Sequence, residues 1–149
     1  MTQRPETAPH LCEIEVRFRE VDAYAVAWHG HYADWLECAR QRYAAAFGFD
    51  LAGELARGYT APMVELCVKY RRPARFGDRL VVEVRTGDDP RPVFDFRYRL
   101  RRPADGELLA TARTIQVLVG PRGLLVGWPE PARALRDALR AHEAALPPW

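Results

Sequence analysis

The residues best suited to chemistry lie in one short stretch, where Asp22 precedes His29 by seven positions. A carboxylate can attack a carbonyl carbon directly, or it can take a proton from water. Backbone N–H groups at the start of a helix have no partner inside the helix, so they can polarise a carbonyl oxygen. An aspartate or histidine at such a position is more often a turn or capping residue. From the residues alone, the capping role is favoured for Asp22.

A long helix is expected directly after this stretch. Apolar side chains recur there at the three- and four-residue spacing of one helix face, and they belong to Tyr32, Leu36, Ala39, Tyr43 and Phe47. The pattern predicts a helix over about 30–47, followed by Gly48 as the expected stop. Because the segment is apolar on most sides, other elements are expected to cover it.

Strands are expected before and after this helix. Residues 11–18 alternate, with one apolar side formed by Cys12, Ile14, Val16 and Phe18. Further strand patterns cover 60–70, 79–86, 93–101 and 108–119. In the third of these, Phe94 and Phe96 are expected on one face and Asp95 on the other.

The connections between these strands predict how the elements pack. Asp105-Gly106 is a hairpin signal, and short connections favour an antiparallel sheet. Shorter helices are expected over 51–58, capped by Asp50, and over 132–146. One long helix against one antiparallel sheet is a two-layer α+β arrangement.

Length and composition limit the class of protein. The 149 residues favour one domain, expected over 11–149 after a disordered or frayed leader over 1–10. A net charge of +2 gives no electrostatic case for nucleic acid binding. Three widely spaced cysteines argue against a disulfide framework or a zinc site. No run approaches the roughly 18 apolar residues of a membrane span, so a cytoplasmic protein is expected.

Two motifs, in order, resemble those of a known family. The stretch DAYAVAWHGHY, from Asp22 to Tyr32, resembles the signature of hotdog-fold acyl-CoA thioesterases of the 4-hydroxybenzoyl-CoA thioesterase and YbgC-like type. Asp22, Trp28, His29 and Tyr32 match that signature, whereas Ala25 stands where the family has glycine. The later stretch VELCVKYRRPARFGD, over 64–78, is similar to the family's second strand and the loop after it.

The resemblance implies a fold, an activity and an assembly. The fold is the hotdog fold, in which an antiparallel sheet wraps a long central helix. The activity is hydrolysis of an acyl-CoA to a free acid and coenzyme A, with no metal and no cofactor apart from the coenzyme A of the substrate. Asp22 is then the nucleophile or general base, and the backbone N–H of His29 polarises the carbonyl. The His29 imidazole orients Asp22 or binds substrate. A homodimer or a dimer of dimers (a homotetramer) is expected.

The remaining candidates bind substrate, and each has a structural alternative. An arginine cluster on the 71–78 loop suits the phosphates of coenzyme A, but it is equally a solvated loop; it consists of Arg71, Arg72 and Arg75. Glu65 lies on an otherwise apolar strand, so it lines the pocket or is paired at a sheet edge. Trp28 and Tyr32 contact the acyl group or belong to the core.

Two other functions compete with acyl-CoA hydrolysis. One is a thioesterase that acts on an acyl carrier protein in a lipid or polyketide pathway, because a phosphopantetheine arm presents the same chemistry inside the pocket. The other is a non-catalytic hotdog module that binds acyl groups. The sequence does not select the acyl group, and it does not separate direct attack by Asp22 from activation of water.

Overall fold

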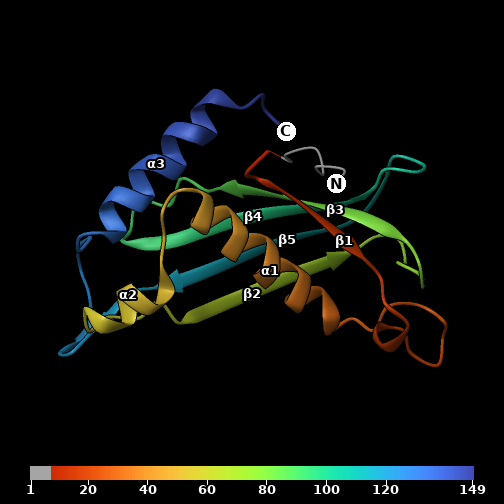
Figure 1. Cartoon of the computed structure of the whole chain (residues 1–149), viewed down its shortest axis with the longest axis horizontal. Helices are drawn as coiled ribbons and strands as arrows, with labels where there is room; N and C mark the ends of the chain where they lie inside the picture. The colour runs from red at the N-terminus through yellow and green to blue at the C-terminus, as the bar shows by residue number, and fades with distance from the viewer. Residues whose placement is uncertain (1–7) are drawn as a thin grey trace, which may run out of the picture. The chain divides into compact units, whose positions relative to one another are not determined.

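The computed structural model describes residues 8–149, and its elements are shown in Figure 1. The N-terminal half contains β1 (Leu11–Glu15), the 3-10 turn η1 (Phe18–Glu20), α1 (His31–Ala46) and α2 (Leu51–Ala56). The C-terminal half contains β2 (Met63–Tyr70), β3 (Arg79–Thr86), β4 (Val93–Arg102), β5 (Glu107–Val117), β6 (Val119–Gly120), β7 (Gly123–Leu124) and α3 (Ala132–Ala145). Five strands form one antiparallel sheet in the order β1-β3-β4-β5-β2, while β6 and β7 pair separately. The predicted α+β class, with one long helix and an antiparallel sheet, is confirmed.

The chain divides into two compact units, which are described separately. The first unit runs to Tyr43 and includes Val68–Val84 and Tyr98–Thr111; the second comprises Ala44–Cys67, Arg85–Arg97 and Ala112–Trp149. The single domain expected over 11–149 stays a prediction. Of the expected leader, residues 1–7 lie outside the described residues. Next to them, the N–H of Leu11 donates to the carbonyl of Ala8 at 2.8 Å.

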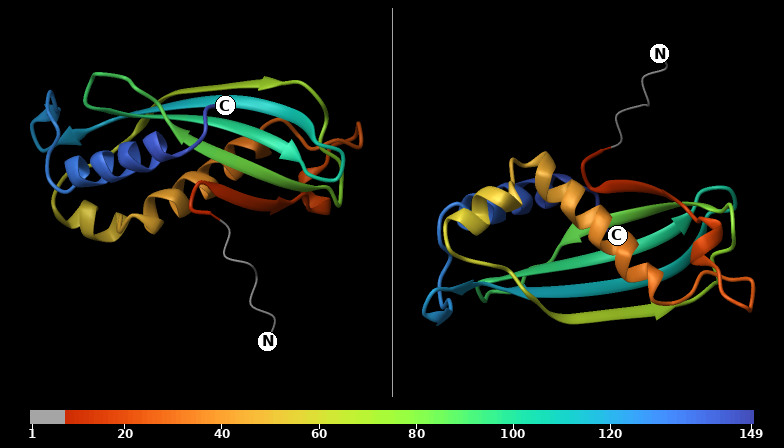
Figure 2. Two further views of the ribbon diagram at one scale, coloured as in Figure 1. Left: turned by 90° about the horizontal axis from the view of Figure 1, so that it is seen from above. Right: turned by 60° about the horizontal axis from the view of Figure 1, so that its bottom comes forward.

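In the first unit, α1 lies along the sheet, as Figures 1 and 2 show from different sides. Tyr32, Leu36, Ala39 and Tyr43 on that face are all buried. The strand β1 pairs antiparallel with β3 from Leu11 opposite Glu83 to Glu15 opposite Arg79. The periodicity therefore identified both the helix and its buried side.

The first strand ends three residues earlier than expected. The backbone N–H of Arg17 donates to the Glu20 carboxylate at 2.7 Å, and this contact turns the chain into η1. Phe18, expected on the apolar side of the strand, is consequently 76% exposed. A local side-chain cap has overridden the alternating pattern.

The second unit contains α3 and the ends of the central strands. Leu135 and Leu139 of α3 are buried. Glu143 accepts hydrogen bonds from the Arg85 guanidinium at 3.0 Å and from the Thr86 backbone N–H at 3.2 Å. These contacts attach α3 to the end of β3.

The strand β2 lies at one edge of the sheet and begins at Met63 instead of residue 60. Pro62 has no N–H to donate, and Thr60 instead forms an isolated bridge with Val119. Several large apolar side chains of β2 are exposed, namely Met63, Val64, Leu66 and Tyr70. An edge strand with apolar side chains facing solvent is a ready template for pairing with another strand.

No helix within residues 8–149 is both long enough and apolar enough to span a membrane.

Candidate active site

In the first unit, residues 20–22 pair with residues 26–28 in a short antiparallel backbone ladder that precedes α1. The N–H of Trp28 donates to the carbonyl of Glu20 at 2.8 Å, and Val21 forms a bridge with Ala27. The N–H of Asp22 donates to the carbonyl of Val26 at 2.9 Å, which closes the loop. Asp22 therefore lies at the closed end of the ladder, and the open end leads directly into the helix.

The Asp22 carboxylate makes the turn contact that its residue type predicts. Its Oδ1 atom accepts a hydrogen bond from the backbone N–H of Tyr24 at 2.8 Å. Ala25 has a φ of 60°, at the position where the family signature has glycine. The turn role expected as the alternative for Asp22 is thus realised, and its second carboxylate oxygen has no hydrogen bond or ion pair to any part of the described chain. A catalytic role for Asp22 stays a prediction.

The backbone of His29 is fixed on both sides, but its N–H has no partner within residues 8–149. The carbonyl before it, from Trp28, accepts from His31 at 3.0 Å. The carbonyl of His29 accepts from the Tyr70 hydroxyl at 2.9 Å. His29 lies two residues before α1 begins at His31, rather than in its first turn. A free N–H this close to a helix N-terminus can still bind a developing negative charge. The described residues contain no hydrogen bond between Asp22 and the His29 ring.

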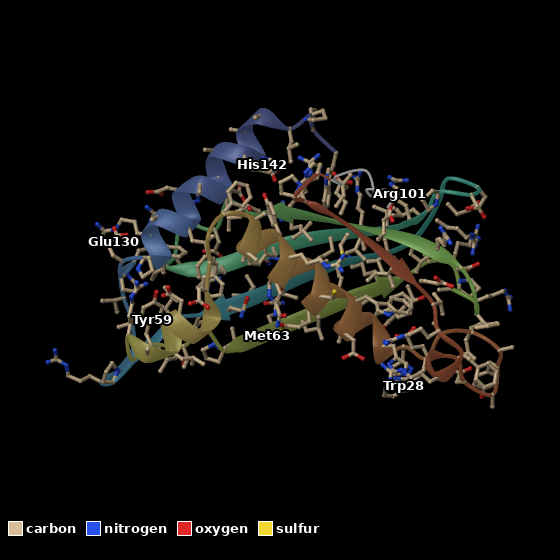
Figure 3. The ribbon with its side chains drawn as sticks, in the orientation of Figure 1. Trp28, Tyr59, Met63, Arg101, Glu130 and His142 are labelled. Carbon is tan, nitrogen blue, oxygen red and sulfur yellow. The ribbon has the colours of Figure 1, made fainter. Side chains whose placement is uncertain are left out.

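Trp28 lies beside the start of α1, where Figure 3 labels it. Its indole packs near His29, with 4.8 Å between ring centroids, and near His31, with 5.6 Å. A Cβ atom on Gly30 would approach the indole to 2.0 Å, so the close packing of this ring requires glycine. Trp28 is 47% exposed and presents part of an aromatic surface to solvent.

Tyr32 lies in the core, where its ring packs against a residue that contacts His29. It is buried, and its ring packs edge-on against Tyr70 at a centroid distance of 4.9 Å. Burial raises the pKa of Tyr32, although a hydrogen bond with the Ala74 backbone opposes this shift. Its role as a substrate contact stays a prediction.

The arginine loop is held next to the ladder in the same unit. The N–H of Ala27 donates to the carbonyl of Ala74 at 2.7 Å, so the loop and the ladder share a hydrogen bond. Arg71 and Arg75 are exposed, and within the described chain neither guanidinium has a hydrogen bond or an ion pair. Arg72 has a loose contact with Glu107, at 3.7 Å. Two cations beside the start of α1 are therefore available to an anionic ligand.

Glu65 belongs to the second unit, on the edge strand β2. Its side chain is about half exposed and lies 3.8 Å from a nitrogen of Arg113. Glu65 is therefore paired and lies on an edge strand, as the structural alternative in the sequence analysis expected. A contact between Glu65 and substrate stays a prediction.

Glu20 is a structural residue of the site that the sequence analysis did not identify. Its buried carboxylate accepts from Arg17 and from the indole N–H of Trp35, the latter at 3.2 Å. Burial raises the pKa of Glu20, but these hydrogen bonds outweigh burial and hold the pKa below its ordinary value. Glu20 thereby ties the ladder to α1. An acidic residue three positions after Arg17 was the signal that pointed to this cap.

The described residues contain no group of three or more histidine, cysteine, aspartate or glutamate side chains arranged to hold a metal ion. His31, the histidine next to the candidate site, instead contacts Asp34 at 3.2 Å through its Nδ1 atom.

The chain matches known proteins in sequence and in structure. Residues 16–135 match the model of the Thioesterase-like superfamily. A Bacillus subtilis (strain 168) protein provisionally named as an acyl-CoA thioesterase, YneP, is 29% identical over 107 residues, which are 72% of this chain and 77% of that protein.

Two solved structures extend the comparison. A 1,4-dihydroxy-2-naphthoyl-CoA thioesterase from Synechocystis superposes with a TM-score of 0.80 at 21% identity, covering 88% of this chain and 97% of that one. A DHNA-CoA thioesterase from Staphylococcus aureus superposes with a TM-score of 0.75 at 26% identity, covering 89% and 93%. The predicted hotdog fold is confirmed, whereas the finer YbgC-like assignment stays a prediction. The chain belongs to the Thioesterase-like superfamily, and it is a thioester hydrolase with the hotdog fold.

Proposed function

We propose that the protein hydrolyses an acyl-CoA thioester to a free acid and coenzyme A. The observation that carries this proposal is the unpaired N–H of His29 at the start of α1, in the same ladder and motif as Asp22. The names of the similar Bacillus and Staphylococcus proteins agree with an acyl-CoA substrate.

The chemistry begins with the thioester carbonyl oxygen at the His29 N–H. As the carbonyl carbon is attacked, negative charge grows on this oxygen, and the N–H and the helix dipole stabilise it. Asp22 supports attack by one of two routes. As a base, it takes a proton from water while the water oxygen attacks, and the proton then passes to the departing thiolate.

In the second route, a carboxylate oxygen of Asp22 attacks the carbonyl carbon itself. The C–S bond breaks, coenzyme A leaves as the thiolate, and an acyl–aspartyl anhydride forms. Water then hydrolyses the anhydride and restores the carboxylate. Both routes end with the same acid and thiol, and both need Asp22 ionised.

The rest of the site holds the two ends of the substrate. Arg71, Arg72 and Arg75 bind the phosphates of coenzyme A, because their exposed guanidinium groups suit phosphate oxygens. The exposed part of Trp28 contacts the acyl group and favours a flat aromatic one. Tyr32 supports this surface from the core, and the His29 imidazole orients Asp22 or binds substrate.

We further propose that the functional protein is a cytoplasmic homodimer or dimer of dimers. The support is the edge strand β2, which presents Val64 and Leu66 to solvent at 61% and 46% exposure. Pairing β2 with a second copy covers these side chains and satisfies the open edge. It also brings Glu65 to the interface, where it can contact substrate.

A carrier protein is the second candidate for the thiol end of the substrate. The same unpaired arginines can dock an acidic carrier protein in place of a nucleotide. In this case the chemistry at Asp22 and His29 is unchanged, and only the contacts of the arginines with the thiol end of the substrate differ.

Free thiol released from a panel of aromatic and aliphatic acyl-CoA substrates, with matched acyl-pantetheines, tests the proposal. We expect hydrolysis of acyl-CoA with a kcat/KM at least about tenfold above that of acyl-pantetheine, because phosphate contacts contribute about 1–2 kcal/mol. Equal values favour the carrier protein. Binding of acyl-CoA without hydrolysis would identify a non-catalytic acyl-binding module and contradict the proposed enzyme.

A further inference from the structure

The peptide groups on both sides of His29 are each held by a separate hydrogen bond. On the N-terminal side, the Trp28 carbonyl accepts from the His31 backbone N–H at 3.0 Å. One peptide earlier, the Trp28 N–H donates to the Glu20 backbone carbonyl at 2.8 Å. On the C-terminal side, the Tyr70 hydroxyl donates to the His29 carbonyl at 2.9 Å. Tyr70 is the last residue of β2 and is 41 positions away in sequence.

The contact from Tyr70 gives the His29 carbonyl a partner outside the helix. His29 lies two residues before α1 begins at His31, so its carbonyl precedes the first one that accepts a hydrogen bond within the helix. That first carbonyl belongs to Gly30 and accepts from the Ala33 N–H at 3.2 Å, an i to i+3 bond. The first turn is tightened, and the His29 carbonyl depends on the side chain of a neighbouring strand.

The phenol is well suited to act as a fixed donor. Its ring packs edge-on against buried Tyr32, which limits its movement. Burial raises the pKa of Tyr70, so its hydroxyl keeps its proton throughout the neutral range.

We propose that Tyr70 is a positioning residue, which fixes the His29–Gly30 peptide and so limits movement of the adjoining His29 N–H, keeping that N–H directed at the thioester carbonyl oxygen. This inference rests on the proposed function. Tyr70 acts through the backbone of His29 and does not itself contact the reacting atoms. Its benefit is preorganisation, because a donor that is already oriented needs no rearrangement as charge develops.

The test compares Tyr70→Phe with the matched variant Tyr59→Phe in the second unit. Each variant removes one hydroxyl that donates a hydrogen bond, but only the Tyr70 hydroxyl bonds to His29. For Tyr70→Phe we expect kcat to fall about 10- to 100-fold with KM within about twofold. We also expect changed amide ¹H–¹⁵N shifts at His29 and Gly30. For Tyr59→Phe, which loses the hydrogen bond from its hydroxyl to the Glu54 carboxylate, we expect a lower Tm and a fall in kcat of less than about threefold.

Two results would overturn the inference while leaving the proposed function intact. One is an active wild-type protein whose kcat is unchanged in Tyr70→Phe. The other is an equal loss of kcat in both variants that follows their loss of Tm, because a purely structural role predicts this. An inactive wild-type protein would overturn the proposed function and the positioning role together, so the two failures are distinguishable.

Discussion

Two arginine clusters, one in each unit, are used in opposite ways. In the second unit, the Arg113 guanidinium binds both oxygens of buried Asp95, at 2.9 and 3.1 Å, and Arg91 binds Asp89 in the same manner. In the first unit, Arg71 and Arg75 extend into solvent with no ion-pair partner anywhere in residues 8–149. In the cluster of the second unit, every named arginine has a carboxylate partner without any ligand. Within the described part of the first unit, Arg71 and Arg75 are unpaired, and so is the N–H of His29.

This difference shows why the first unit is the better place to look for function. Exposed and partly buried ion pairs in proteins are common and mostly structural. Groups that are left unpaired beside a helix start are available to an anion or an oxyanion. The variants below test whether the two clusters differ in function as they differ in pairing.

The largest effect is expected from Asp22→Asn. We expect kcat to fall about 10²- to 10⁴-fold, because the variant removes the base or nucleophile. The amide oxygen introduced by the substitution can still accept from the Tyr24 N–H, so Tm should stay close to that of the wild type. The assay is steady-state thiol release, with thermal unfolding in parallel.

Asp22→Ala is the matched control, because it removes the turn contact as well as the charge. A role limited to capping predicts full activity in Asp22→Asn and a lower Tm only in Asp22→Ala. That result would remove Asp22 from the proposed chemistry.

A loss of stability is expected from Arg113→Met in the second unit. The variant leaves the buried Asp95 carboxylate without its bidentate partner, so we expect the free energy of unfolding to fall by about 1.5–3 kcal/mol. Chemical denaturation measures this change. Arg122→Met, at an exposed arginine that has no partner in the described chain, should change stability by less than about 0.5 kcal/mol. An equal effect in both variants would contradict the contrast between the clusters.

A smaller effect, confined to binding, is expected from the double variant Arg71→Ala/Arg75→Ala. KM for acyl-CoA should rise about 5- to 10-fold, because exposed charge contacts contribute about 1 kcal/mol. KM for acyl-pantetheine, which lacks the nucleotide phosphates, should not change. Arg122→Ala serves as the control for a general loss of positive charge. Equal increases for both substrates would argue against phosphate binding by this loop.

The smallest effect concerns acid stability. Hydrogen bonds from Arg91 are the main cause that lowers the pKa of Asp89 from 3.8 to about 2. Because the folded-state pKa is below the unfolded value, this carboxylate stabilises the fold above about pH 4. The contribution is lost as the pH falls toward 2. The free energy of unfolding should therefore depend less on pH in Asp89→Asn than in the wild type over this window. Parallel curves would show that the pair contributes nothing to acid stability.

Periodicity in the sequence was enough to predict most of the elements and several of their buried faces. Leu80, Val82 and Val84 alternate in β3, and all three are buried. Such patterns are local and record which side of an element avoids water. Asp95 was expected on the polar face, opposite Phe94 and Phe96, yet it is 3% exposed, because Arg113 and the loop at Gly87 cover it. Partners that are distant in sequence leave no such local pattern.

The candidate site was predicted in part for the same reason. The family motif indicated Asp22 and His29, and the arginine loop followed from composition. The bond from Tyr70 to the His29 carbonyl joins two distant segments, and no local pattern in either segment indicates it. The burial of Tyr32 was left open by the sequence, because core and pocket aromatics share the same helical spacing.

The most direct test of the account is a crystal structure of the Asp22→Asn variant with an intact acyl-CoA bound. We expect the thioester carbonyl oxygen within about 2.7–3.1 Å of the His29 backbone nitrogen, with the substituted side chain at position 22 facing the carbonyl carbon. An ordered thioester whose carbonyl oxygen lies beyond hydrogen-bonding distance of that nitrogen would contradict the account.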